Sequence, residues 1–168
     1  MPWGIAVDEV GDVYVADWRN DRVQKFSTGG EFKMAFGTSG CGDGEFNRPS
    51  GVDVDRHGDI YVVDRGNNRV QLFNEEGRYV QQFIGDATLS KVAISYMMTN
   101  AYPNRLRDMA KLEIQKLLRW PQSVVVSEDG LMYVPDTGSY RVQVYRKEAV
   151  ELNELQFAPP RRAPALNI

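Results

Sequence analysis

Acidic and basic side chains recur together at a fixed spacing along the chain. An aspartate is followed five residues later by an arginine at three places, which are Asp17 and Arg22, Asp64 and Arg69, and Asp136 and Arg141. A carboxylate beside a guanidinium can bind an anion or orient a substrate. A group that catalysis needs once would not recur in every repeat, whereas a carboxylate that caps a turn and an arginine that pairs with it would recur. The repetition therefore favours a structural function for all three pairs.

Three isolated side chains are the remaining candidates for chemistry. Asp53 is expected on the inner strand of its repeat, where the other repeats have Ala6 and Val125. A calcium site needs several oxygen ligands that converge, so this lone carboxylate is the one metal candidate and does not make a site by itself. His57, the only histidine, is expected in an exposed turn, and Cys41 lies in a glycine-rich segment without an identifiable base. We therefore assign no catalytic residue and no cofactor.

The composition limits the class of protein. The chain has 168 residues with 42% hydrophobic and 26% charged residues and a net charge of -3, which is typical of a folded domain rather than a disordered one. No apolar run is long enough to span a membrane, and the first residues do not resemble a signal peptide. One cysteine excludes an internal disulfide. The compartment stays open, and a reducing, cytoplasmic one is favoured.

Three similar segments must supply the elements that position these side chains. They span residues 2–26, 49–73 and 121–145, with offsets of 47 and 72 residues between consecutive segments. Their β-branched and aromatic runs, separated by glycine-containing turns, are typical of strands. For the first unit we expect strands at residues 4–8, 12–16, 22–26 and 31–36. A meander of four strands with a period near 47 residues predicts a propeller blade.

The repeated residues resemble a known family. The patterns Pro-x-Gly-Ile/Val-x-Val-Asp, Gly-Asp-Val/Ile-Tyr-Val-x-Asp and Asn-x-Arg-Val-Gln-x-Phe are similar to the NHL repeat, and residues 37–49 resemble its inter-blade linker. The resemblance covers residues 2–85 and 120–145. Because NHL domains typically have six blades, it implies an all-β fold, a partial β-propeller of about three four-stranded blades, which is half of a six-bladed NHL propeller.

The period also predicts how the chain is divided. We expect NHL-type blades within residues 1–157, with blade 1 at 2–37, blade 2 at 49–85, a helical insertion at 86–120 and blade 3 at 121–157. In the insertion, an amphipathic helix after Pro103 would place Ile114 and Leu117 on an apolar stripe that packs on the propeller. The insertion carries a net charge of +3, so a nucleic acid, an anionic membrane surface or an acidic partner remains an alternative contact. Residues 158–168 are expected to form an extended tail rich in proline and arginine.

An open stack of three blades would expose apolar faces at both ends. Three explanations stay open: further blades belong to a longer parent chain, a second copy completes the ring, or the arc is stable by itself. The upstream coding sequence would distinguish the first explanation from the other two.

Ligands of propellers usually bind the face formed by the loops between the second and third strands and by the inter-blade linkers. That face is expected to carry the aromatic and basic residues Trp3, Trp18, Arg19, Arg48, Arg65 and Tyr140. Side chains of these types are frequent interface anchors. We therefore predict a non-catalytic NHL-repeat module that binds a protein or peptide. The alternatives are an RNA-binding NHL domain, and a metal-dependent propeller hydrolase whose other ligands lie in further blades.

Overall fold

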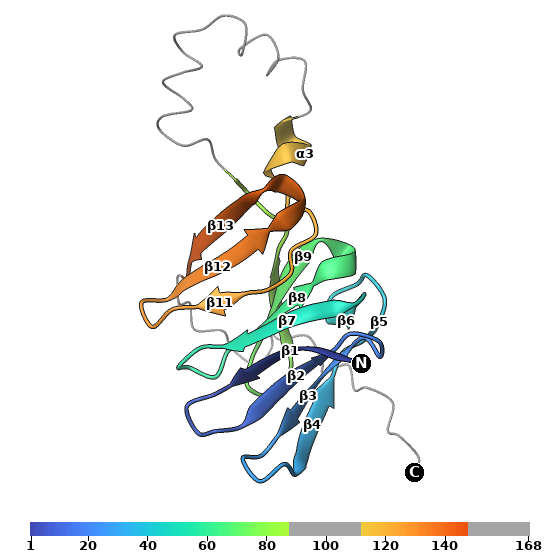
Figure 1. Cartoon of the computed structure of the whole chain (residues 1–168), viewed down its shortest axis with the longest axis vertical. Helices are drawn as coiled ribbons and strands as arrows, with labels where there is room; N and C mark the ends of the chain where they lie inside the picture. Colours follow the sequence, from blue (N-terminus) through green and yellow to red (C-terminus); the bar gives the residue numbers. More distant parts are fainter. Residues whose placement is uncertain (88–111, 148–168) are drawn as a thin grey trace, which may run out of the picture.

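The computed structural model describes residues 1–87 and 112–147, and these form three antiparallel sheets that follow one another along the molecule (Figure 1). Blade 1 contains β1 (Pro2–Val7), β2 (Val13–Asp17), β3 (Arg22–Phe26) and β4 (Phe32–Phe36). Blade 2 contains β7 (Pro49–Val54), β8 (Ile60–Asp64), β9 (Arg69–Phe73) and β10 (Tyr79–Phe83). Blade 3 contains β11 (Val125–Val126), β12 (Leu131–Asp136) and β13 (Arg141–Arg146).

The remaining elements are short connections. The linker between blades 1 and 2 holds the parallel pair β5 (Thr38–Ser39) and β6 (Glu45–Phe46). Single 3-10 turns, η1 (Arg65–Asn67) and η2 (Thr137–Ser139), join the second strand to the third in blades 2 and 3. Helix α3 (Leu112–Lys116) precedes the linker into blade 3.

The predicted fold class is confirmed, because each blade is an antiparallel meander and the blades stack face to face as in a β-propeller. The strands of blade 1 lie within two residues of their predicted bounds. Three strands of blade 3 are described, and the fourth strand that we expect after Tyr145 lies outside the described residues.

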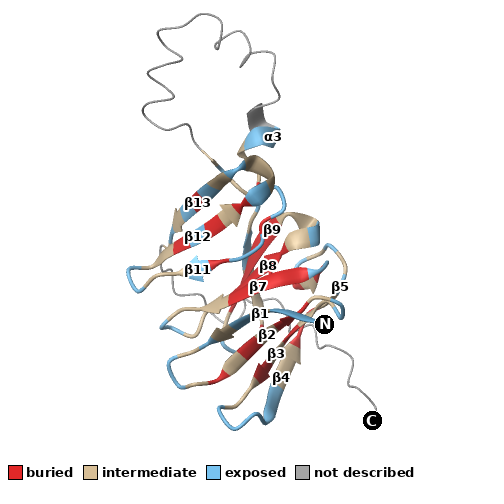
Figure 2. Ribbon diagram, viewed as in Figure 1, coloured by how far each residue is buried: buried red, intermediate tan, exposed pale blue. Residues whose placement is uncertain are grey.

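Two hydrophobic clusters hold the stack together, one on each side of blade 2. Between blades 1 and 2, Tyr14, Val62 and Phe73 pack around Phe46 of the linker. Between blades 2 and 3 the cluster includes Leu118, which takes the place of Phe46 in the second linker. Blade 2 is covered on both faces, and Figure 2 shows the burial concentrated on β7, β8 and β9.

The inner strands of neighbouring blades approach most closely at one repeated position. A Cβ atom on Gly4 would lie 2.7 Å from the Cα of Gly51, and a Cβ on Gly51 would lie 2.9 Å from the Cα of Ser123. Neither distance leaves room for a side chain without a shift of backbone, so glycine is required where blades 1 and 2 face the next blade. Blade 3 has Ser123 at this position and therefore carries a Cβ there.

The described ends of the insertion lie side by side. The backbone nitrogen of Leu118 donates to the carbonyl of Ile84, and that of Ala87 donates to the carbonyl of Lys116. The predicted stripe is wrong at Ile114, which is 56% exposed near the end of α3. Leu118, which the alignment of Leu118–Pro121 with Phe46–Pro49 predicts as the apolar anchor of the linker, is buried. The other predicted helical positions up to residue 111 lie outside the described residues. No helix within the described ranges is long and apolar enough to cross a membrane.

Candidate functional site

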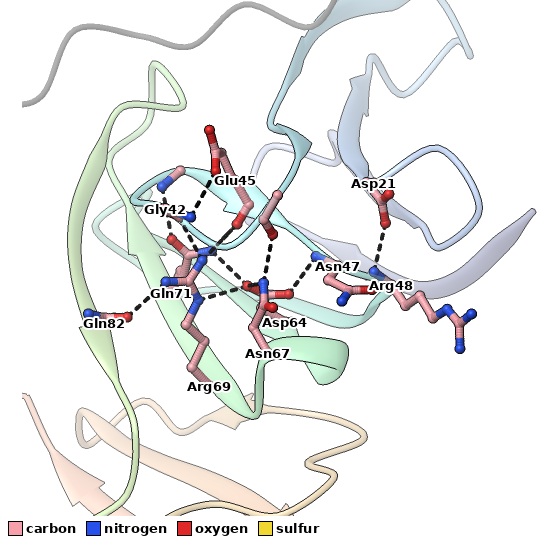
Figure 3. A network of polar contacts seen from close by, with 12 residues as sticks. Asp21, Gly42, Glu45, Asn47, Arg48, Asp64, Asn67, Arg69, Gln71 and Gln82 are labelled. Atoms are coloured by element: carbon pink, nitrogen blue, oxygen red, sulfur yellow. Dashed lines mark hydrogen bonds and ion pairs between the residues drawn. The ribbon is translucent and has the colours of Figure 1, made fainter.

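Asp64 is the centre of a buried polar network at the end of β8 (Figure 3). Its Oδ2 accepts hydrogen bonds from Arg69 Nε at 2.7 Å and from Asn67 Nδ2 at 2.8 Å, and its Oδ1 accepts one from the backbone nitrogen of Asn47 at 2.8 Å. Arg69 also donates through Nη2 to the carbonyls of Gly42 and Glu45, at 2.7 and 2.9 Å. The network therefore fastens the incoming linker to its blade.

The same arrangement recurs in blade 3. Arg141 Nε lies 2.8 Å from Asp136 Oδ2, and Arg141 Nη2 donates to the carbonyl of Leu117 at 2.9 Å. The backbone nitrogen of Arg119 donates to Asp136 Oδ1 at 2.6 Å. In blade 1 the corresponding pair is looser, with Arg22 Nε 3.4 Å from Asp17 Oδ2. In all three blades the arginine is thus directed toward its own aspartate.

Burial governs the electrostatics of Asp64. Removal of the carboxyl from water raises its pKa above the ordinary value, although the donors from Asn47, Asn67 and Arg69 favour the ionised form. A carboxylate in this position depends on its donors, because a buried charge without hydrogen-bonded partners is strongly destabilising. Both oxygens of Asp64 and all three guanidinium nitrogens of Arg69 thus already have partners within the described residues.

Asp53, the metal candidate, lies between two blades. Its Oδ2 accepts a hydrogen bond from the backbone nitrogen of Val126 at 2.6 Å, and its Oδ1 accepts one from Val54. Burial raises the pKa of this carboxyl, against the effect of both backbone donors. Asp53 therefore joins β7 to β11, and no group of three or more His, Cys, Asp or Glu side chains suited to a metal ion occurs within residues 1–87 and 112–147.

A cleft of about 490 Å³ lies beside blade 2, where the linkers enter blades 2 and 3. We call it the linker cleft, and its lining consists of Asn47, Arg48, Arg65, Gly66 and Trp120. The two linkers contribute Asn47, Arg48 and Trp120, and the loop after β8 contributes Arg65 and Gly66. The close approach requires Gly66, because a Cβ there would lie 2.6 Å from the carbonyl oxygen of Asn47. The strand turns that carry Glu9, Glu75 and Glu128 are elsewhere in the blades.

Arg48 is held in place from two directions. Its backbone nitrogen donates to Asp21 Oδ1 at 2.7 Å, which stabilises a positive φ of 56°. Its guanidinium carbon lies 5.2 Å from the ring centroid of Trp18, within cation-π range, and the Trp18 ring is 5.5 Å from that of Trp3. Figure 3 shows the side chain of Arg48 extending away from the Asp64 network. The two tryptophans thus support an arginine at the edge of the linker cleft.

Arg65 has no such support. Its Nε is shielded from solvent and has no hydrogen-bond partner among the described residues. Neither Arg48 nor Arg65 forms an ion pair within the part of the chain that the structure describes. The linker cleft therefore carries two guanidinium groups whose charges no described carboxylate balances.

The structure distributes the six predicted ligand residues unevenly. Arg48 and Arg65 line the linker cleft, and Trp18 and Trp3 lie behind Arg48. Arg19 is exposed at the position where blades 2 and 3 have a glycine, and Tyr140 is 98% exposed and is not part of the cleft lining.

Sequence reasoning missed Trp120. This residue is 62% exposed, and its backbone nitrogen donates to Asn68 Oδ1 at 2.8 Å, as that of Arg48 does to Asp21. Trp120 precedes Pro121 as Arg48 precedes Pro49, so alignment of the two linkers places it at the position of a residue already selected. The repeat itself was the signal that could have identified it.

Comparison with solved structures supports the fold. Hydrazine synthase from Kuenenia stuttgartiensis is similar with a TM-score of 0.58 at 12% identity, over 86% of this chain and 32% of that one. A putative phosphatase from Bacteroides thetaiotaomicron is similar with a TM-score of 0.56 at 18% identity, over 88% of this chain and 35% of that one. A protein of unknown function from Bacteroides caccae is similar with a TM-score of 0.52 at 14% identity, over 80% of this chain and 38% of that one. The chain thus spans about a third of the length of these proteins.

Comparison at the sequence level concerns the first two blades. No curated protein matches the chain significantly. The model of the NHL repeat matches residues 1–26 and 46–73, which contain the first three strands of blade 1 and of blade 2. The chain carries two NHL repeats, and they form consecutive blades of a partial β-propeller.

Proposed function

We propose that this propeller-type module is non-catalytic and binds a protein or peptide ligand at the linker cleft. The observation that carries the proposal is the combination of two unbalanced guanidinium groups with an exposed tryptophan around one hollow. Arginine and tryptophan are over-represented among residues that dominate binding energy, because they bury a large area and form directional contacts. The volume is in the range of pockets that hold a few side chains.

The linker cleft is also suited to binding because its frame is rigid. The backbones of Arg48 and Trp120 are fixed by Asp21 and Asn68, and Gly66 donates to the carbonyl of Asn47 at 2.8 Å. Binding to a prepared surface loses less conformational entropy than binding to a mobile one. The side chains that point outward from this frame are therefore free to serve a ligand.

A selection from a random peptide library tests the proposal. The full chain is immobilised, and enriched peptides are measured by fluorescence anisotropy against the wild type, an R48A/R65A/W120A variant and an E75A/E76A control at a distant turn. We expect peptides that bind the wild type and the control and lose at least tenfold in affinity for the cleft variant. Peptides that keep their affinity for the cleft variant and lose it for the control would show that the wrong surface was chosen.

A further inference from the structure

The charge of the linker cleft restricts which ligand it accepts. Two carboxylates near the cleft are already engaged: Asp64 accepts four donors through its two oxygens, from Asn47, Asn67, Arg69 and Gln71. Asp21 accepts hydrogen bonds from the backbone nitrogen of Arg48 and from Ser39. The guanidinium groups of Arg48 and Arg65 form no ion pair within residues 1–87 and 112–147. A ligand that brings a negative charge would supply a counter-charge.

Arg65 is the more informative of the two arginines. The guanidinium of Arg65 forms no hydrogen bond or ion pair among the described residues, so no polar contact of this side chain accounts for its presence. Arg69, four residues later, has a partner for each of its three guanidinium nitrogens. Arg78 Nε also lacks a partner among the described residues, so the feature that distinguishes Arg65 is its place in the lining of the linker cleft.

The size of the site favours a carboxylate on a peptide over a nucleic acid. Binding of a nucleic-acid strand depends on a row of cations that follows successive phosphates. Here two guanidinium groups share one hollow of about 490 Å³, and the whole chain has a net charge of -3. Arginine matches the planar geometry of a carboxylate with paired hydrogen bonds.

We propose that the linker cleft recognises an acidic side chain of an extended peptide, with the carboxylate between Arg48 and Arg65 and the neighbouring peptide against Trp120. This specificity rests on the proposed function, since it names the chemical class of the same ligand. The cation-π contact with Trp18 holds the guanidinium of Arg48 in position to bind the carboxylate. The bound carboxylate would also balance the positive charge of Arg65.

The test uses three fluorescent probes with the full chain. The first is a short Glu-Ser repeat peptide, acetylated and amidated so that only side chains carry charge; the second has Gln in place of Glu; the third is a short oligouridylate. The protein variants are R48Q, R65Q and the matched control R56Q, which changes an exposed arginine in the turn between β7 and β8. Melting temperatures are recorded for each variant, and R65Q is expected to melt like the wild type because no bond to Arg65 is lost.

We expect the Glu-Ser peptide to bind the wild type and R56Q, with affinity that falls as salt rises. Each cleft variant should lose roughly tenfold or more, since a hydrogen bond to a charged group contributes about 1.5 to 3 kcal/mol. Equal affinity for the Gln peptide would overturn the carboxylate proposal and leave peptide binding intact. The carboxylate proposal would also be overturned if oligouridylate bound the wild type more tightly than the Glu-Ser peptide does. It would be overturned as well if R56Q lost as much affinity for the Glu-Ser peptide as the cleft variants do. Failure of the random library to yield any cleft-dependent peptide would instead contradict the proposed function.

Discussion

Arginines that look alike in the sequence have different tasks in the structure. Arg69 is buried and bonded to Asp64, to Gln82 and to two linker carbonyls. Arg65 and Arg48 have no ion-pair partner among the described residues and face a cleft. The distinction depends on position in the repeat, because Arg69 is one of three equivalent arginines and Arg65 stands where blade 1 has Trp18. Recurrence in the sequence therefore indicates residues that build a blade, and the residues that we propose bind a ligand lie at positions that vary between the blades.

Replacement of Arg69 tests the structural assignment. We expect R69A to lower the free energy of unfolding by about 3 to 5 kcal/mol, because it leaves the buried carboxylate of Asp64 without its charged partner. Urea unfolding of R69A and of R65Q measures the two effects side by side. An R69A protein as stable as the wild type would refute the assignment.

The loss of unfolding free energy in R69A should depend on pH. The pKa of Asp64 is already raised in the folded chain, so the folded state holds the proton more tightly than the unfolded state does, and ionisation costs stability as pH rises above the unfolded value of about 3.9. Loss of Arg69 raises this pKa further. The deficit of R69A should therefore be larger at neutral pH than near pH 4.

At the scale of elements, the strands were predictable and their connections were not. Alternation of apolar residues and the 47-residue offset predicted the strands of blades 1 and 2, because each strand is defined by neighbours in sequence. The exposure of Ile114 could not be predicted from helical spacing alone, since spacing does not show where the helix ends or that Leu118 pairs with the distant Ile84. The linker cleft was predicted in part: its arginines came from the loop positions, but its walls come from two linkers and one loop that only the stacked blades bring together.

Contact between blades 2 and 3 includes a polar connection at the turns. Lys147 forms ion pairs with Asp55, at 2.6 Å, and with Asp59. Burial alone would lower the pKa of Lys147, but the two carboxylates outweigh it and raise this pKa above its ordinary value. The pairs therefore connect the end of β13 in blade 3 to the turn between β7 and β8 in blade 2.

Removal of this lysine should weaken the alkaline stability of the fold. Because the folded pKa of Lys147 is raised, its contribution is complete below the unfolded value of about 10.4 and is lost as pH rises through the folded value. We expect K147Q to lose about 1 kcal/mol at neutral pH, since the pair is partly exposed and screened, and to approach the wild type at high pH. Urea unfolding from pH 7 to above about 11 measures this convergence, with K33Q as a control for an ion pair within blade 1. A K147Q deficit that stays constant over this range would contradict the prediction.

At the scale of the molecule, blades 1 and 3 at the two ends of the stack expose apolar side chains, and several of their equivalents in blade 2 are buried. Val142 and Val144 are exposed on blade 3, whereas Val70 and Leu72, their equivalents in blade 2, are buried. On blade 1 the exposed apolar residues include Ile5, Val7 and Phe32. Apolar patches of this kind are uncommon on isolated soluble proteins. Whether further blades or a second copy cover these ends stays a prediction, as do the boundaries of the insertion and the tail.

Charge placed on the open face should therefore change the behaviour of the isolated chain. We expect the wild type to self-associate as concentration rises and V144E to do so less, without a loss of melting temperature, because Val144 is 53% exposed and the substitution removes little buried apolar area. Light scattering and thermal melting across a concentration series provide the measurements. A wild type that scatters as a compact monomer at every concentration would show that the open faces do not drive association.

Ser123, on the inner edge of blade 3, affects how closely a further blade could pack at this end of the stack. Head-to-tail stacking of identical units has no natural end: it closes into a ring or continues as a fibre. Blades 1 and 2 accept the next inner strand because Gly4 and Gly51 leave the necessary space, but Ser123 places a Cβ where that strand would come within van der Waals distance. A further blade could not approach blade 3 as closely as blade 2 approaches blade 1. It would have to lie further from blade 3 and would lose contact area along its inner strand. We therefore expect a further blade at this end to pack less closely on blade 3 than blade 2 packs on blade 1.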